Sequence, residues 1–279
     1  MLRNRLLTAL AAAPLAAGLL IAASPLFGAS PLRSSNPRAA TVQKVFPSAV
    51  RIRITAAGEV VRTASGIAFA HEGGKTYLLT NAHVVELSRA WKAPVEIRVL
   101  PSGGQPQLPA SVTAHGRVPD SDLAVLEVPG VLPITPLASD DGLDLGDDLV
   151  VIGAPFGKGL SVAAGIVSQV EYELAENAEA PRAPKSLKTD APIGYGSSGG
   201  GVFDVPRGRL VGLVEGYRTA RVAFGKDEEY SFDVPMPGET FVAPAAKIRR
   251  FLGDSGLGRL VGAEAAARGA VATPAAPRL

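Results

Sequence analysis

Residues 189–204 read TDAPIGYGSSGGGVFD, and the turn GSSGG at 196–200 lies at their centre. A serine between glycines in a sharp turn holds its hydroxyl at an exposed apex, while neighbouring backbone N–H groups converge beside it. An acyl-transfer nucleophile needs that geometry. By itself the turn is a weak indication, because runs of glycine and serine most often form flexible loops.

Two segments upstream supply partners for a serine in this turn. Residues 78–85 (LLTNAHVV) place His83 inside an apolar run, and residues 120–126 (DSDLAVL) place Asp122 directly before another apolar run. An imidazole titrates near neutral pH and can accept a hydroxyl proton, and a carboxylate can hold the other imidazole N–H. The order His, Asp, Ser along the chain is one of the orders known for the serine-protease triad.

The segments that carry these residues resemble a known family. Three of them resemble the catalytic motifs of trypsin-like serine proteases, closest to the bacterial HtrA/Deg type: TNAHVV (80–85), DSDLAVLEV (120–128) and GSSGGGVFD (196–204). Residues 151–168 (VIGAPFGKGLSVAAGIVS) and 232–252, with FDVP and AAKIRRFL, also resemble this family. The resemblance implies an all-β fold of two small antiparallel β-barrels, with the active site in the cleft between them and a C-terminal helix.

The resemblance also implies a role for each residue of the site. Ser198 would be the nucleophile, His83 its general base, and Asp122 the carboxylate that orients the imidazole. Asp122 is preferred to Asp120 because it directly precedes the apolar strand, where the family places this residue. The backbone N–H groups of Gly196 and Ser198 would form the oxyanion hole.

The resemblance also implies a substrate-binding pocket at four positions, Pro192, Ile193, Gly216 and Phe232. Neither Pro192 nor Ile193 offers an acid to a basic side chain, which favours cleavage after small or medium apolar residues. Glu215 leaves three orientations open: toward the cleft, against the His–Asp pair, or toward solvent. With three histidines and no matching carboxylate spacing, the sequence indicates no metal site, and no cofactor is expected.

Composition narrows the class of protein and its partners. The 279 residues are 47% hydrophobic and 19% charged, enough to bury a sizeable core. The net charge of +2 argues against a nucleic-acid surface, so polypeptide substrates are the expected partners. The absence of cysteine excludes a thiol nucleophile, a cysteine-based zinc site and any disulfide.

The N-terminus predicts export. Residues 1–23 combine a basic start with an uncharged run of Leu, Ala and Ile from residue 6, which is typical of an export signal and also close to the length of a membrane anchor. Cleavage and membrane attachment through residues 6–23 both remain open, with localisation in the periplasm, cell envelope or medium. The other expected ranges are a linker at 24–41, the protease domain at 42–262 with lobes at about 42–132 and 133–252, and a disordered tail at 263–279. The chain ends too soon after the protease unit for a PDZ domain.

Short strands separated by Gly, Pro and Asn predict the β-rich fold. Residues 42–54 are expected to include a half-buried strand, and 244–253 form the one convincing helical pattern. Two charged insertions, 173–188 and 217–230, are expected to form loops near the cleft or plain solvated surface. The remaining strands are expected at 64–70, 75–81, 95–100, 123–128, 148–152, 160–173, 202–204, 209–214 and 231–234.

Two classes of function fit this sequence, with a third as a weaker alternative. The first is an exported serine endopeptidase that acts in cell-envelope proteolysis or protein quality control. The alternative is a catalytically silent binding or chaperone module with the same fold. A serine esterase fits less well, because the Gly-x-Ser-x-Gly elbow between a strand and a helix is absent.

Overall fold

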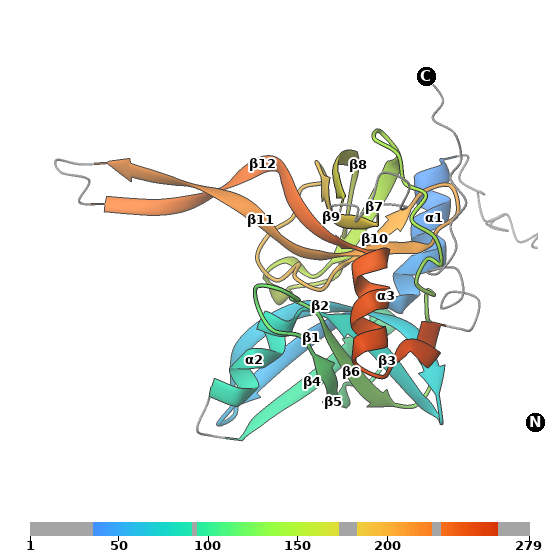
Figure 1. Ribbon diagram of the computed structural model, residues 1–279. Helices are drawn as coiled ribbons and strands as arrows, with labels where there is room; N and C mark the ends of the chain where they lie inside the picture. Colours follow the sequence, from blue (N-terminus) through green and yellow to red (C-terminus); the bar gives the residue numbers. More distant parts are fainter. Residues whose placement is uncertain (1–35, 91–93, 173–182, 225–229, 262–279) are drawn as a thin grey trace, which may run out of the picture. The chain divides into compact units, whose positions relative to one another are not determined.

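Two closed antiparallel β-barrels of six strands each form the body of the protein in the computed structural model (Figure 1). The structure describes residues 36–90, 94–172, 183–224 and 230–261. The expected export segment, most of the linker and the expected tail lie outside the described residues. The two barrels and the C-terminal helix confirm the fold class expected from the sequence.

The first barrel carries the strands before residue 130. Its strands follow the order β1-β2-β3-β6-β5-β4 around the barrel. Leu78 of β3 and Ile52 and Ile54 of β1 point into this barrel, while Arg51 and Arg53 alternate with them on the outside. The strands are β1 Ala49–Ala56, β2 Glu59–Glu72, β3 Lys75–Thr80, β4 Val95–Pro101, β5 Leu108–His115 and β6 Ala124–Pro129.

The second barrel carries the strands after residue 147, in the order β10-β11-β12-β9-β8-β7. The core of this barrel extends across the contact with the first barrel. Leu79 and Val125 of the first barrel pack in the same cluster as Ile152 and Phe203. The two barrels therefore share one continuous apolar contact. The strands are β7 Asp148–Gly153, β8 Ser161–Tyr172, β9 Pro184–Thr189, β10 Gly201–Asp204, β11 Leu210–Phe224 and β12 Tyr230–Pro244.

Three α-helices and four short 3₁₀ turns complete the described part. Helix α3 confirms the expected C-terminal helix and buries Ile248, Phe251 and Leu252. Helix α2 follows β3 directly and was not expected, because its nine residues are too few to show a clear helical period. The helices are α1 Pro37–Val45, α2 Ala82–Ala90 and α3 Ala245–Asp254, and the turns are η1 Phe46–Ser48, η2 Ser102–Gly104, η3 Pro155–Gly157 and η5 Gly258–Val261.

The start of the folded part differs from the expectation. Helix α1 begins at Pro37, so the expected linker already contains structure, and the expected strand at 42–54 holds only from Ala49 onward. Asn36 caps the helix by accepting from the N–H of Arg38, and the proline at its first turn needs no hydrogen-bond donor there. The buried Thr41 then ties the helix to the second barrel by donating to the Val205 carbonyl at 2.7 Å.

The prediction of loops at 173–188 and 217–230 is wrong for those of these residues that the structure describes. Residues 184–189 form strand β9, and residues 217–224 pair with β12 from Thr219↔Pro235 to Phe224↔Tyr230. The charged residues misled the prediction, because in a two-stranded ribbon they alternate with apolar residues on opposite faces. Strand β5 was also not expected, since LPASVTAH has weak apolar alternation. No helix among the described residues is long and apolar enough to cross a membrane.

Candidate active site

The pairing of β3 with β6 brings His83 and Asp122 together. Thr80 at the end of β3 lies opposite Ala124 at the start of β6. Helix α2 begins just after Thr80, and Asp122 lies just before Ala124. The two functional side chains are 39 residues apart in sequence but are placed by one register of one sheet.

Two contacts fix the geometry of this pair. The Asp122 carboxylate accepts from the backbone N–H of His83 at 2.9 Å, and its other oxygen lies 2.7 Å from His83 Nδ1. A carboxylate oxygen only accepts, so Nδ1 carries the proton and Nε2 is left as the acceptor nitrogen. Asn81 holds the loop by donating to the Asp122 carbonyl at 2.8 Å. Arg62 on β2 donates to the His83 carbonyl, and burial lowers the pKa of that guanidinium.

The turn before β10 places Ser198 in the same cavity as His83. This cavity has a volume of about 640 Å³. The turn is closed by two backbone bonds, from Ser197 N–H to Gly194 at 3.0 Å and from Gly200 N–H to Ser197 at 2.8 Å. The residues that line the cavity are Arg62, Thr63, Ala64, His83, Val84, Phe156, Ile193, Gly194, Tyr195, Gly196, Ser198, Gly216, Tyr217 and Thr219.

Two glycines allow the turn to take this shape. Gly196 and Gly199 have φ angles of 90° and 80°, a region that side chains disfavour. A Cβ atom on Gly196 would lie 2.7 Å from the Ala154 carbonyl oxygen, and one on Gly199 would lie 2.2 Å from that of Ser65. Both glycines are thus required by conformation and by close approach of the backbone.

Two backbone N–H groups of the turn around Ser198 make no hydrogen bond within the described residues. Within the described part of the chain, the N–H groups of Gly196 and Ser198 have no acceptor, whereas that of Gly199 donates to Val214 at 3.0 Å. The Tyr195 carbonyl accepts from the Phe156 N–H at 2.6 Å. Because a trans peptide directs its carbonyl and its N–H to opposite sides, this bond turns the Gly196 N–H away from Phe156.

Ser65 of the first barrel holds the nucleophile turn of the second. Its hydroxyl donates to the Gly196 carbonyl at 2.7 Å and accepts from the Ala154 N–H at 2.8 Å. Its backbone N–H donates to the Ser198 carbonyl at 2.9 Å. Ser65 is almost fully buried. One residue therefore joins three segments across the contact between the barrels. Sequence reasoning missed it because the two partners of its hydroxyl lie 131 and 89 residues away.

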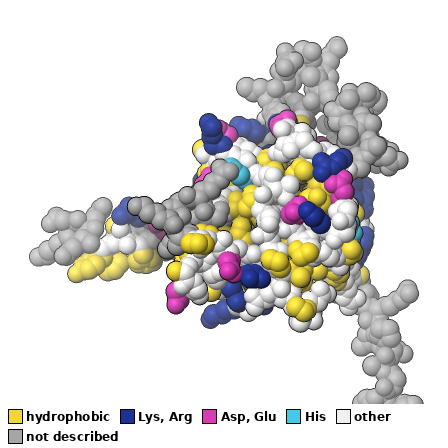
Figure 2. Space-filling model, turned by 90° about the horizontal axis from the view of Figure 1, so that it is seen from below, with side chains coloured by type: hydrophobic (Ala, Val, Ile, Leu, Met, Phe, Trp, Pro, Cys, Tyr) yellow, Lys and Arg dark blue, Asp and Glu magenta, His cyan; other side chains and the backbone are white. Residues whose placement is uncertain are grey.

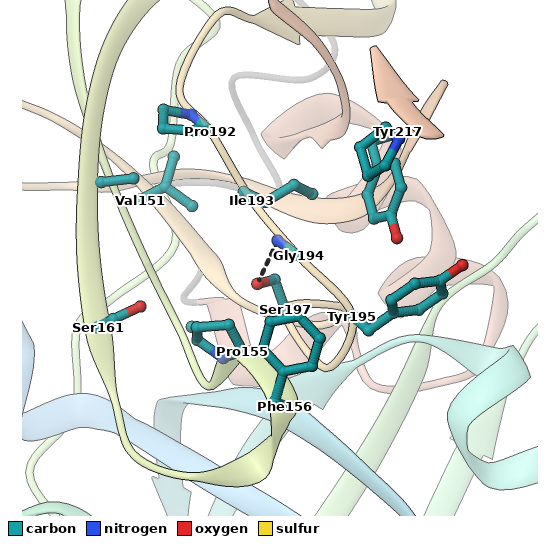
Figure 3. A pocket seen from close by; sticks show the side chains of 13 residues that line it. Val151, Pro155, Phe156, Ser161, Pro192, Ile193, Gly194, Tyr195, Ser197 and Tyr217 are labelled. Carbon is teal, nitrogen blue, oxygen red and sulfur yellow. Dashed lines mark hydrogen bonds between the residues drawn. The ribbon is translucent and has the colours of Figure 1, made fainter. Parts of the chain in front are cut away.

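An apolar pocket of about 500 Å³ adjoins the cavity that contains Ser198 (Figure 3). Val151 and Pro192 lie at one side of it, while Tyr195 and Tyr217 stand at the other, with their ring centres 5.8 Å apart. No charged side chain is among the described residues that line this pocket. Ser197 also lines this pocket, and its hydroxyl accepts from the Gly194 N–H at 3.4 Å.

Tyr217 lines both cavities, as do Phe156, Ile193, Gly194 and Tyr195. Its hydroxyl is buried and has no hydrogen-bond partner among the described residues. Burial raises the pKa of Tyr217 to about 12, and the neighbouring phenol of Tyr195 adds to the shift. Both tyrosines stood in segments singled out from the sequence, but neither showed by its type that it faces the cleft.

The structure brings most of the predicted site residues together, with one exception. Pro192 and Ile193 line the apolar pocket, and Gly216 lines the cavity of Ser198. Phe232 lies on the exposed part of β12 and lines neither cavity. The Glu215 carboxylate accepts from Lys247 of α3 at 2.7 Å, so it pairs with this helix. The described residues contain no cluster of His, Asp and Glu side chains suited to a metal ion.

Comparison with known proteins shows the family of this chain. Residues 64–213 match the model of the trypsin-like peptidase domain, a stretch that contains His83, Asp122 and Ser198. The chain therefore belongs to the trypsin-like peptidase family.

Within that family, the chain is similar to proteins of the HtrA/DegP type. It is 36% identical over 146 residues to the periplasmic serine endoprotease DegP of Salmonella typhimurium. The matched residues cover 51% of this chain and 28% of that protein. It is 35% identical over 156 residues to the serine protease Do-like HtrA of Bacillus subtilis, covering 53% and 32%. The chain thus spans about a third of the length of these relatives. The serine endoprotease of Yersinia pestis shares the fold, with a TM-score of 0.57 and 24% identity over 77% of this chain and 65% of that one.

Proposed function

We propose that this chain is an exported serine endopeptidase, which hydrolyses peptide bonds through Ser198, His83 and Asp122 by way of an acyl-enzyme. The observation that carries the proposal is the 2.7 Å contact of His83 Nδ1 with Asp122 in the cavity that Ser198 lines. An unassisted serine hydroxyl is almost fully protonated near neutral pH, so it needs such a base to attack a carbonyl.

The chemistry follows from these positions. Ser198 Oγ bonds to the substrate carbonyl carbon while its proton passes to His83 Nε2, and Asp122 stabilises the imidazolium that results. The carbonyl oxygen gains the negative charge and accepts from the N–H groups of Gly196 and Ser198. The C–N bond then breaks, and the imidazolium gives its proton to the leaving amine. A water molecule repeats the attack, with His83 as base, and releases the acid product and free Ser198.

The apolar pocket sets the proposed specificity. Burying a charged substrate side chain beside Val151, Pro192 and Ile193 would leave that charge without a partner, because no charged residue is among those described there. We therefore expect cleavage after small or medium apolar residues.

The family resemblance and the N-terminal sequence support a place in the cell envelope. Relatives of this chain are named periplasmic endoproteases, and residues 1–23 have the composition of an export signal. Proteolysis in the envelope, including quality control of unfolded proteins, is the proposed setting. The mass of the chain recovered from the envelope will show whether residues 6–23 are removed or retained as an anchor.

Hydrolysis of a mixed peptide library, with products identified by mass spectrometry, tests the proposal. Ser198→Ala is expected to abolish all cleavage, while Ser197→Ala is the matched control. The hydroxyl of the neighbouring Ser197 bonds to Gly194 instead of facing His83, so its loss is expected to reduce activity by less than about tenfold. A folded wild-type protein that cleaves nothing would instead favour the silent binding module. Equal activities of the two variants would argue against Ser198 as the nucleophile.

A further inference from the structure

The distal part of β11 and β12 forms a two-stranded ribbon that projects from the second barrel (Figure 1). We call residues 219–224 and 230–236 the distal ribbon. Among the described strands, β10 pairs with β11 only up to Leu213, and β9 pairs with β12 only from Thr240 onward. Both outer edges of the distal ribbon are therefore unpaired along its length.

The register of the ribbon separates apolar from polar side chains. Residues that lie opposite each other in an antiparallel pair share one face, and the pairs Val222↔Phe232 and Phe224↔Tyr230 alternate with Arg221↔Asp233. The polar face is held together by Arg221, whose guanidinium donates to Ser231. The apolar face carries Ala220, Val222, Phe224, Tyr230, Phe232, Val234 and Met236.

This apolar face is open to solvent and continuous. Phe224, Tyr230 and Phe232 are 54%, 56% and 53% exposed. The Phe224 ring contacts those of Tyr230 and Phe232 at centroid distances of 5.6 and 6.0 Å. Figure 2 shows hydrophobic side chains along the projecting part. A contiguous exposed apolar patch of this kind marks an interaction surface.

The base of the same two strands belongs to the candidate active site. Tyr217 and Thr219 of β11 line the cavity of Ser198, and Pro235 of β12 lines the apolar pocket. A polypeptide that occupies the cleft and continues past Thr219 meets the distal ribbon next. Thr219 and Pro235 pair with each other on the polar face, so the strands of the ribbon, and not its apolar face, reach the cavity and the pocket.

We propose that the distal ribbon binds an extended, apolar-rich segment of the polypeptide being cleaved, outside the cleft. Because the occupant is the substrate, this assignment rests on the proposed function. An unpaired strand edge offers backbone hydrogen bonds to any extended chain, and an apolar face beside it binds alternate side chains. The residues that join the two strands, GKDEE at 225–229, carry more acid than base, which disfavours anionic lipid as the partner.

The length of the ribbon defines which substrates reach it. The run from Thr219 to Phe224 spans about 17 Å at the rise of an extended strand, which corresponds to about five substrate residues. A short peptide that only fills the cleft meets Thr219 and Pro235 but not the aromatic residues farther along the ribbon. An unfolded protein chain reaches both the cleft and these aromatic residues.

Phe224→Ser combined with Phe232→Ser tests the assignment, with Val131→Ser combined with Leu145→Ser as the matched control. The control residues are 70% and 68% exposed and belong to neither strand of the ribbon. The substrates are reduced, alkylated α-lactalbumin and a six-residue peptide copied from one of its cleavage sites. For the ribbon variant we expect kcat/KM for the long chain to fall 10- to 100-fold, because the two aromatic side chains that would contact the bound substrate are lost. The six-residue peptide should change less than twofold, as should both substrates with the control.

Other outcomes overturn the assignment. Equal loss for the long and short substrates would show damage to the cleft. A change from dimer to monomer in sedimentation would identify a second copy as the occupant, and loss of binding to phosphatidylglycerol vesicles would identify a membrane. If the wild-type chain hydrolyses neither substrate, the proposed function fails separately. Fluorescence anisotropy with labelled, alkylated α-lactalbumin and Ser198→Ala then decides whether the ribbon still binds an unfolded chain.

Discussion

The two barrels hold their halves of the candidate active site in different ways. In the first barrel, His83 and Asp122 are fixed by one strand register and by contacts within that barrel. In the second barrel, the turn that carries Ser198 depends on the hydroxyl and backbone of Ser65, which belongs to the first. The base is therefore locally supported, whereas the nucleophile depends on the packing between barrels. Substitutions that remove these contacts test the difference between the two barrels.

Among these contacts, the one between Asp122 and His83 is expected to matter most for activity. Asp122→Asn keeps the shape of the side chain but replaces one accepting oxygen by a donor, which disfavours the Nδ1–H tautomer of His83. We expect kcat to fall about 10⁴-fold at neutral pH, as measured by hydrolysis of a short peptide. Asp120→Asn, two residues earlier, is the control and should stay within twofold. Equal effects of the two variants would remove Asp122 from the triad.

The support of the nucleophile comes next. Ser65→Ala removes the bond to the Gly196 carbonyl and leaves the Ala154 N–H unpaired. Because a small displacement of the oxyanion donors is costly, we expect kcat to fall about 10- to 100-fold with little change in KM.

A second buried serine controls for lost stability. Ser48 is as buried as Ser65, and its hydroxyl contacts Val45 and Thr135 away from the cleft. Both Ser→Ala variants should lower the free energy of unfolding by about 1–3 kcal/mol, but only Ser65→Ala should lower kcat. A loss of kcat in both would show that stability, and not position, limits activity.

The strand that leaves the nucleophile turn provides a stability prediction within the second barrel. Arg209 pairs with the buried Asp204 of β10 at 3.2 Å and with Asp140 at 2.6 Å. Arg209→Met leaves Asp204 buried without its cation, so we expect the free energy of unfolding to fall by about 3 kcal/mol in urea denaturation. Arg98→Met, which breaks an exposed pair with Glu96, should cost less than about 1 kcal/mol. Similar losses would mean that Asp204 does not need its partner.

The smallest expected effect concerns Tyr217, which lines both cavities. Burial raises the pKa of its phenol from 10.0 to about 12. The folded state therefore holds this proton longer than the unfolded state, so its contribution to stability is complete below pH 10 and is lost as the pH rises toward 12. In a titration of tyrosinate absorbance, Tyr217→Phe should remove an ionisation with a pKa of about 12. An unchanged absorbance around that pH would contradict the raised pKa of this phenol.

The sequence predicted those features that lie in short motifs. The order of His83, Asp122 and Ser198, the glycines around the serine and the helical spacing at the C-terminus were all local, and the two-barrel fold followed from the resemblance they carry. Ser65 could not be found in this way, because its partners belong to distant segments of the other barrel.

The ribbon was missed for a different reason. Charged residues such as Arg221 and Asp233 lie on one face of the ribbon. In the sequence alone, such charged residues predict a loop. Only the register shows that they alternate with exposed aromatic residues on the other face. The same register places Phe232 on the projecting ribbon, while sequence alone had assigned it to the pocket.

Fluorophosphonate labelling tests the central claim most directly. The wild-type chain, His83→Ala and Ser198→Ala are treated with the reagent, and the modified residue is located by mass spectrometry. We expect label on Ser198 in the wild type and none in either variant, because the reagent reacts with a serine activated by a base. A folded wild-type chain that takes no label, or label on Ser198 that persists without His83, would contradict a nucleophile activated by the His83–Asp122 pair.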